Sequence, residues 1–358
     1  MLRSAFILIV SAIAIFPHFA FGEPVVPRKL RVGFVLPLTG PAAPYGVAIK
    51  NSVDLALREV RGAADVIEPI FEDAQFDLKL AVASFNKLRT VSKTDVIVVW
   101  GLGQCKVVAP LADLNSSPMI ALCLATDVAK NRRYVLRFQS SGDDYMRTTA
   151  EWLYQKGKRK IGVVVADTPY TEEMYQALLR QKLPSQEIQL LDRVASHSGD
   201  FYSQFAKLRR AQVDALGVLL NVGQIGTFAK QLKSNVRGLT IFGTNVFGSR
   251  SEIEVADGSL SSSTYAELVL AHEFIERYQR NFGDDSQLGF GALAYEIVRA
   301  ISLSAKSFLS AKDTDATILD AMMQNGEVKS EIVGQYTFNQ NEGEGKHVTF
   351  PLTMLQIP

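Results

Sequence analysis

The sequence predicts an α/β protein with two lobes, each built on a parallel sheet. Short β-rich runs alternate with stretches of helical periodicity, and this alternation is typical of a parallel sheet with helices on both faces. Eight such runs fit two sheets better than one. The length of 358 residues also exceeds the roughly 250–300 residues at which a single core usually stops growing.

The eight β-rich runs are spread along most of the chain. They cover residues 31–36, 66–72, 96–100, 119–122, 161–166, 188–191, 215–220 and 239–243. Helical faces lie between them, and after the first run Ile49, Val53 and Ala56 recur at helical spacing. Asp77 precedes another periodic run, 78–88, and its short carboxylate predicts a helix N-cap.

The first 22 residues read as a secretory signal peptide. Arg3 precedes an apolar run, 5–16, and small residues at Ala20 and Gly22 stand where a signal peptidase cleaves. No later segment offers the ~18 uninterrupted apolar residues that a spanning helix needs. We therefore expect an exported protein, cleaved near Gly22, that does not insert into a membrane. No cysteine lies at the cleavage point, which argues against a lipid anchor.

The net charge and the distribution of basic residues do not indicate a nucleic-acid partner. The formal net charge is +1, and the basic residues are dispersed. The densest basic cluster, at residues 156–160, lies between a predicted helix and a predicted strand, where it reads as a solvated connection.

The segment 31–46, RVGFVLPLTGPAAPYG, joins a β-rich run to a helix through a Gly/Pro-rich turn. The turn from Pro37 to Gly46 cannot continue the strand, and the helix that follows begins with unpaired backbone N–H groups. Such groups attract carboxylates and other anions, so this arrangement predicts a ligand site.

At this turn the chain resembles the type I periplasmic solute-binding proteins of the leucine/isoleucine/valine family, the binding components of branched-chain amino acid ABC transporters. Members open with a strand, a P-L-(T/S)-G-P turn, an aromatic-Gly pair and a helix, which here are Pro37, Leu38, Thr39, Gly40, Pro41, Tyr45 and Gly46. The resemblance implies two Rossmann-like lobes with parallel central sheets, joined by three hinge crossovers.

On this resemblance we divide the mature chain between two lobes. The first lobe is expected to contain residues 23–138 and 266–332, and the second residues 139–265 and 333–358. The hinge crossings then fall near residues 137–140, 259–265 and 331–334.

Ligand-binding residues are expected beyond the carboxyl ends of the strands. Gln104 and Cys105 follow the third run in the loop GLGQCK, which is too incomplete for a dinucleotide fingerprint. The resemblance implies that this loop holds ligand through backbone N–H groups and a serine hydroxyl, at whose position this chain has Cys105. Ala125 and Thr126 match the family's Ala-Thr segment, which contacts a ligand carboxylate. Capping of the next turn is the alternative for Thr126.

Three residues complete the expected site from the second lobe. Tyr170 matches the family's acidic-x-x-Tyr pattern and is expected to close over ligand, or else to pack on its own helix. Asn221 follows the run 215–220 and adds an amide. Asn245 stands where amino-acid-binding relatives usually place a glutamate that pairs with the ligand ammonium. A neutral amide cannot neutralise that charge, so an amide, an amine-free carboxylate or an aromatic acid would suit the pocket at least as well as leucine.

The two cysteines, Cys105 and Cys123, follow neighbouring predicted strands. A disulfide between them is one alternative in an oxidising compartment, and a free thiol at Cys105 facing ligand is the other.

The sequence contains no residue pattern that indicates an enzyme. The histidines that follow the signal peptide, His197, His272 and His347, are far apart in sequence, and neither a G-x-S-x-G elbow nor a P-loop occurs. We expect neither a cofactor nor a metal, since His272 and Glu276 would form only half of a metal site.

These observations together predict a periplasmic binding protein. We expect a monomer that captures a small polar or carboxylate-bearing solute between two closing lobes and delivers it to the inner-membrane permease of an ABC importer. A ligand-sensing module for a receptor or kinase is the alternative, and an α/β hydrolase or dehydrogenase is a remote one.

Overall fold

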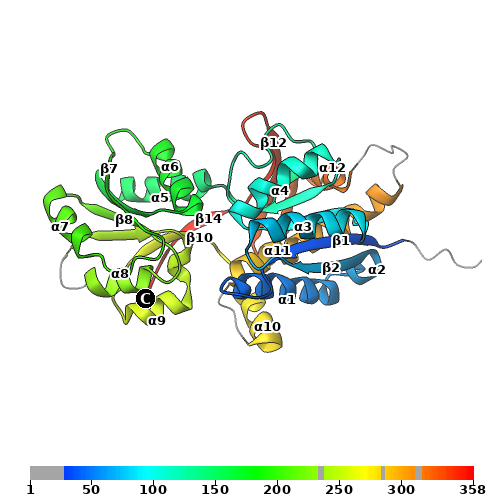
Figure 1. Cartoon of the computed structure of the whole chain (residues 1–358), viewed down its shortest axis with the longest axis horizontal. Coiled ribbons are helices and arrows are strands. Elements are labelled where there is room, and N and C mark those ends of the chain that lie inside the picture. The colour runs from blue at the N-terminus through cyan, green and yellow to red at the C-terminus, as the bar shows by residue number, and fades with distance from the viewer. Residues whose placement is uncertain (1–27, 233–237, 284–286, 311–316) are drawn as a thin grey trace, which may run out of the picture.

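A computed structural model describes residues 28–232, 238–283, 287–310 and 317–358. The predicted signal peptide lies outside these residues. Figure 1 shows two α/β lobes side by side along the long axis of the molecule, with β10 and β14 close to the junction between them.

The first lobe has an eight-stranded sheet in the order β11-β12-β13-β5-β4-β3-β1-β2. The six strands from β13 to β2 pair in parallel, and β11, β12 and β13 pair antiparallel. The strands are β1 (Leu30–Leu36), β2 (Ile67–Asp73), β3 (Val96–Trp100), β4 (Met119–Leu122), β5 (Val135–Arg137), β11 (Glu327–Ser330), β12 (Gly334–Asn341) and β13 (Gly345–Thr349).

Helices cover both faces of this sheet because side chains of successive strand residues alternate between the faces. Phe34 packs in one core with α1 and α11, whereas Val35 packs in a second core with α3 and α4. The helices of the lobe are α1 (Ala43–Glu59), α2 (Ala63–Val66), α3 (Leu78–Thr90), α4 (Leu102–Leu114), α10 (His272–Phe282), α11 (Leu288–Ser310) and α12 (Ile318–Met323).

Helix α11 is long and apolar enough to span a membrane by composition, but its most apolar window is 72% buried inside the protein. Ala292, Ile297 and Ile301 of this helix lie in the core that α1 also lines. It is therefore the core helix of the first lobe.

The second lobe has a six-stranded sheet in the order β14-β10-β9-β8-β6-β7, parallel except for β14. Helices α5 and α6 cover one face, and α7, α8 and the short helices η1 and α9 cover the other. The elements are α5 (Gly142–Gln155), β6 (Lys160–Ala166), α6 (Pro169–Gln181), β7 (Glu187–Val194), α7 (Tyr202–Ala211), β8 (Ala215–Leu219), α8 (Ile225–Leu232), β9 (Thr240–Gly243), η1 (Asn245–Gly248), α9 (Arg250–Ala256), β10 (Thr264–Leu268) and β14 (Leu352–Gln356).

Two of the chain's passages between the sheets lie later than the sequence predicted. Strand β10 pairs with β9, so residues 266–268 belong to the second lobe and the chain leaves it only after Leu268. Strands β12 and β13 belong to the first sheet, where β13 pairs with β5, so the crossing predicted near Gly334 is wrong. Phe338 packs against Phe138 at 5.9 Å between ring centroids, and this first-lobe core holds the β12–β13 hairpin in place.

Hydrogen bonds hold the segments that pass between the lobes: the first is tied to the segment between β13 and β14, and the second to the β11–β12 turn of the first lobe. The first runs from the end of β5 to α5, and its Ser140 hydroxyl accepts a 3.2 Å hydrogen bond from the backbone N–H of Phe350. The second follows β10, where the N–H of Ala271 donates to the carbonyl of Ile332 over 2.8 Å. An open depression of about 370 Å³ lies beside this junction, lined by residues 269–271, 330–334 and 351–353.

All eight predicted β-rich runs are strands, and Asp77 caps α3 by accepting the N–H groups of Lys79 and Leu80. The sequence did not predict β5, β10 or the strands from β11 to β14. β5 and β10 are short, and β11 to β14 follow one another near the end of the chain. These strands therefore lack the alternation of strand and helix that made the other strands predictable.

Candidate ligand-binding site

The turn before α1 is closed by Asp73 at the end of β2. Its carboxylate accepts the backbone N–H groups of Leu38 (2.9 Å), Thr39 (3.3 Å) and Gln75 (3.0 Å) and the Thr39 hydroxyl (2.5 Å). Burial opposes ionisation of Asp73, but the Thr39 hydroxyl and the three N–H groups together lower its pKa. At the helix start, Ala43 and Tyr45 donate their N–H groups to carbonyls of the same turn. The expectation that free N–H groups here attract an anion is therefore wrong.

Gly46 sets how closely α1 approaches this turn. A Cβ at Gly46 would lie 2.1 Å from the carbonyl oxygen of Pro37, far inside contact distance. Only glycine permits the approach, and it places the preceding residue, Tyr45, beside the carboxyl end of β3.

Four aromatic residues meet at this end of the first lobe, and we call them the aromatic cluster: Tyr45, Phe76, Trp100 and Phe290. The Tyr45 ring stacks on Trp100 with centroids 4.8 Å apart and meets the edge of Phe290 at 5.6 Å. Trp100 also contacts Phe76 and Phe290, each at 5.5 Å. The indole N–H of Trp100 is buried and has no hydrogen-bond partner in the described part of the chain. Such a donor is suited to a bound solute.

Phe76 is held at the edge of this cluster by Gln104, one of the residues that the sequence analysis expected to contact ligand. Gln104 is buried, and its side-chain amide donates a 2.9 Å hydrogen bond to the Phe76 carbonyl. Phe76 itself is 50% exposed and has a left-handed backbone conformation, φ +60°. A bulky residue in that conformation is uncommon outside functional loops. Gln104 therefore positions an aromatic side chain of the cluster.

On the second lobe, Tyr170, Asn245 and Glu267 form what we call the second-lobe polar group. The Tyr170 hydroxyl donates to Oδ1 of Asn245 over 2.7 Å, and the Asn245 side chain also hydrogen-bonds the Glu267 carboxylate. Thr168 caps α6 just before Tyr170 and donates to Oδ1 of Asn221 over 3.1 Å. Asn221 thus holds the start of α6 and reaches the polar group only through that helix.

Glu267 is the candidate site residue that the sequence reasoning missed. It lies near the carboxyl end of β10, is half-buried, and accepts the N–H of Leu268 over 2.8 Å. Burial raises its pKa to about 7 against the lowering effect of its two hydrogen bonds. The alternation in TYAEL directly before the crossing was the available signal, because it marks a strand whose carboxyl end reaches the junction of the lobes.

Three tyrosines, one each from α5, α6 and β10, lie near enough to Glu267 for its charge to affect their pKa values. Burial is the main cause of the raised pKa of Tyr145, Tyr170 and Tyr265, and the charge of Glu267 raises all three further. Burial also raises the pKa of Tyr45 to about 12, with a contribution from Glu252 of the second lobe. The candidate site is therefore rich in buried phenols and includes one carboxylate, that of Glu267.

The aromatic cluster and the second-lobe polar group come together between the lobes. Tyr45 and Tyr170 belong to different lobes, yet they lie near enough that the charge of an ionised Tyr45 raises the pKa of Tyr170. A Cβ placed on Gly289, which precedes Phe290, would lie 3.9 Å from Oε1 of Glu267. The two groups thus face each other across the junction.

Two of the residues expected to contact ligand lie in the core of the first lobe. Cys105 and Ala125 are fully buried there, and the Cys105 thiol donates to the Val99 carbonyl over 3.1 Å. Cys105 therefore does not reach the junction of the lobes. It hydrogen-bonds the neighbouring Cys123 thiol, and the two sulfurs are not joined in a disulfide. Thr126 is half-buried, and its hydroxyl has no hydrogen bond to the described residues.

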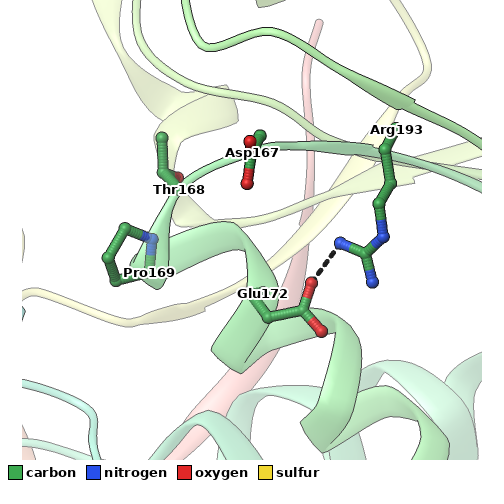
Figure 2. Close-up of a pocket in the computed structure, with 5 residues that line it drawn as sticks. All are labelled: Asp167, Thr168, Pro169, Glu172 and Arg193. Carbon is green, nitrogen blue, oxygen red and sulfur yellow. Dashed lines mark hydrogen bonds and ion pairs between the residues drawn. The ribbon is translucent and has the colours of Figure 1, made fainter.

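A separate depression of about 470 Å³ opens on the second lobe at the carboxyl ends of β6 and β7. Figure 2 shows Asp167 between Thr168 and Arg193, with Glu172 paired to Arg193. Hydrogen bonding to Arg193 lowers the pKa of Glu172, so this pair is fully charged at neutral pH. The depression is open to solvent and includes neither the aromatic cluster nor the second-lobe polar group.

No three His, Cys, Asp or Glu side chains of the described ranges are grouped as a metal site requires. Nε2 of His272 lies 3.2 Å from Oε1 of Glu276 on an exposed face of α10, as the sequence spacing suggested, and forms only half of such a site.

Comparison with known structures shows which fold this is. The chain aligns over 92% of its length with an ABC transporter substrate-binding protein from Sphaerobacter thermophilus (93% of that chain, 16% identity, TM-score 0.81). It aligns equally far with the leucine-binding protein LivK from Thermotoga maritima (95% of that chain, 16% identity, TM-score 0.76). It also aligns over 92% of its length with a solute-binding protein from R. palustris in complex with benzoate (94% of that chain, 16% identity, TM-score 0.76).

These similarities show the two-lobed architecture of type I periplasmic binding proteins. No curated protein matches the sequence. The family model described as periplasmic binding protein matches residues 29–358, which is all but the first part of the chain. This chain is therefore a member of the periplasmic binding protein family.

Proposed function

We propose that the protein is the periplasmic substrate-binding component of an ABC importer and that it captures a small organic solute between its lobes. The observation that carries this proposal is the aromatic cluster of the first lobe facing the second-lobe polar group across the junction. Neither half alone can enclose a solute. A site divided in this way gives a ligand more contacts when the lobes meet, and that difference in affinity is what shifts the open–closed equilibrium.

The solute has an apolar or aromatic portion. Tyr45, Phe76 and Phe290 offer ring faces and edges, and a half-buried or exposed ring gains most when an apolar group covers it. The solved relatives bind solutes of this kind, since one is named as leucine-binding and another is in complex with benzoate.

The solute also carries polar groups at its ends. The unpartnered Thr126 hydroxyl and the Trp100 N–H can each donate to a carboxylate from the first lobe. This arrangement supports a role for Thr126 in ligand contact over a role as a turn cap, because its hydroxyl accepts no backbone N–H of the described residues.

Membership of the family and the predicted signal peptide support delivery of the solute to an inner-membrane permease. The protein is expected in the periplasm as a monomer that begins just after Gly22, and intact mass with size exclusion of the exported form measures both.

A thermal-shift panel tests the binding function. The mature protein is heated with branched-chain and aromatic amino acids, their amine-free acids, the matching amines and simple amides. A ligand at 100 times its Kd adds about 2.7 kcal/mol to the free energy of unfolding, which is a shift of several degrees. Stabilisation by one chemical class supports the proposal. A folded protein that no panel member stabilises at millimolar concentration contradicts it.

A further inference from the structure

We propose that Cys105 and Cys123 become joined in a disulfide when the protein folds outside the cytoplasm. The structure describes the reduced form of this pair, two thiols in hydrogen-bond contact. They are the only cysteines of the chain, so neither has another partner within it. The proposal concerns the first lobe alone and does not depend on which solute the protein binds.

The backbone brings the two cysteines together from neighbouring parallel strands. Strands β3 and β4 pair so that Trp100 lies opposite Leu122, and Cys123 follows Leu122 directly. Gly101 donates its N–H to the Leu122 carbonyl over 3.2 Å and accepts the N–H of Cys105 over 2.9 Å. Two hydrogen bonds therefore connect the first turn of α4 to the end of β4, and they place Cys105 beside Cys123.

The two side chains meet in an apolar core. Cys105 is fully buried and Cys123 is 4% exposed, and both belong to the core that α3 and α4 form on one face of the sheet. The Cys105 sulfur hydrogen-bonds both the Cys123 side chain and the backbone of Leu122. A disulfide forms without strain only where two cysteines already lie close together, and sulfurs in contact meet that condition.

The surroundings of Cys123 favour its thiolate, which is the form that reacts. Burial opposes ionisation, but the hydrogen bond with Cys105 and the backbone N–H of Ala125 lower the pKa of Cys123. The charges of Arg137 and Lys106 lower it further. Burial raises the pKa of Cys105, and the neighbouring Cys123 raises it more, so Cys105 keeps its proton. Cys123 is therefore the attacking sulfur, and Cys105 completes the bond.

The reaction is an exchange with a second disulfide. The family is periplasmic, and the periplasm is a compartment in which disulfides form and persist. The oxidant is the disulfide of a thiol–disulfide oxidoreductase or of oxidised glutathione. The Cys123 thiolate attacks one sulfur of this oxidant, whose S–S bond breaks and releases a thiolate, and a mixed disulfide remains. Cys105 then loses its proton and attacks Sγ of Cys123, which expels the second sulfur of the oxidant. The oxidant thus gains two electrons and leaves as two thiols, after it takes up the two protons that the cysteines lost.

Burial decides when the bond forms and how long it lasts. Both sulfurs are covered in the folded lobe, so the exchange takes place while β3, α4 and β4 come together. The same core then shields the bond from external thiols. About 18 residues separate the two cysteines, and a bond across a loop of that length restricts the unfolded chain and stabilises the lobe.

The bond also anchors the residue that holds Phe76 at the edge of the aromatic cluster. Gln104 precedes Cys105 in the first turn of α4, and its side-chain amide donates a 2.9 Å hydrogen bond to the Phe76 carbonyl. Joining this turn to the end of β4 fixes the backbone of Gln104 and, through it, the position of Phe76.

The test counts the thiols of the exported protein. The full chain is exported, purified from the periplasm without reductant, and unfolded in guanidinium chloride with excess N-ethylmaleimide. Intact mass spectrometry then counts the labels, and a sample that is reduced before labelling is the reference. We expect a monomer without label, and two labels after reduction. Two labels without prior reduction, another group attached to either cysteine, or a disulfide-linked dimer would overturn the proposal.

Urea unfolding with and without a reductant measures what the bond contributes. We expect the reductant to raise the unfolding equilibrium constant of wild type roughly 100-fold, as the chain-entropy model gives for a loop of this length. Cys105→Ala and Cys123→Ala are the controls, because the reductant should leave both unchanged. The double variant should lose little more stability than either single variant, since each has already lost the bond. Single losses that add in the double variant, with no effect of the reductant on wild type, would show two independent core thiols and overturn the proposal.

Discussion

The Tyr170 hydroxyl donates a 2.7 Å hydrogen bond to Oδ1 of Asn245 and thereby ties the first turn of α6 to the helix that follows β9. Two residues 75 positions apart in the chain are joined where β6 and β9 end. The bond also fixes the Asn245 amide that hydrogen-bonds Glu267, so one phenol organises the second-lobe side of the site.

Tyr170→Phe should weaken ligand binding about tenfold and lower the free energy of unfolding by about 1 kcal/mol, the net contribution of one hydrogen bond. The ring remains, so only the hydroxyl is tested. Calorimetry and urea unfolding measure the two effects. Tyr202→Phe, at a 65% exposed tyrosine on α7, is the control and should change neither value. Undiminished affinity in Tyr170→Phe would mean that Asn245 is oriented by other contacts.

Replacing Tyr45 tests the aromatic cluster. Tyr45→Phe keeps the stacking on Trp100 and should bind ligand within a few-fold of wild type, whereas Tyr45→Ala removes it and should lose about tenfold or more. The measurement is a calorimetric titration with the best ligand of the panel. Equal affinities in the two variants would place the apolar part of the solute elsewhere.

Gly46→Ala should destabilise the first lobe by about 3 kcal/mol, because the new Cβ meets the carbonyl oxygen of Pro37 and cannot be accommodated without moving α1. Gly199→Ala is the matched control, since a Cβ there meets nothing within 4 Å, and it should change stability by less than about 1 kcal/mol. Urea unfolding of the two variants provides the comparison. A Gly46→Ala protein as stable as wild type would show that α1 can shift freely.

The ligand-free protein should lose stability as the pH rises from about 4.5 to about 7. Burial raises the pKa of Glu267 to about 7, so the folded protein keeps a proton that the unfolded chain has already released, and ionisation at neutral pH opposes folding. The contribution of this group is at most about 3 kcal/mol. Carboxyl groups such as Asp73 and Asp144, whose hydrogen bonds outweigh burial and lower their pKa values, act in the opposite direction and at lower pH.

Urea unfolding at several pH values measures this dependence. Glu267→Gln should flatten the curve over the stated range, and Glu273→Gln, which changes an exposed residue of α10, should leave it as in wild type. Identical curves for wild type and Glu267→Gln would show that the carboxyl titrates as an ordinary glutamate.

The sequence was sufficient for local structure and for the general location of the site. β-rich runs, the cap at Asp77 and the two-lobed class all follow from short-range patterns, and the structure brings Tyr170 and Asn245 into direct contact. Tyr170 and Asn245 follow the ends of parallel strands, as the reasoning from strand ends predicted, and the assignment of these residues to ligand stays a prediction.

The pairing of strands that are far apart in the chain could not be predicted from the sequence. No local pattern in residues 334–349 shows whether that hairpin pairs with β5 or with the second sheet. Long-range contacts decide it, among them the packing of Tyr336 and Phe338 against Phe138. Glu267 was missed for the same reason, because its strand was divided between a crossing segment ending at Tyr265 and the start of the first lobe. Gln104 was read as a ligand contact because its position after β3 is right, yet its amide points to the Phe76 carbonyl.

The most direct test of the central claim is the fluorescence of Trp100. The chain has only two tryptophans, so a Trp152→Phe protein reports on the aromatic cluster alone. If a solute binds between the lobes, the emission of that protein should change saturably with the solute that stabilises it most, at the affinity measured by calorimetry. A solute that binds by calorimetry and leaves the Trp100 emission unchanged would contradict the location of the site.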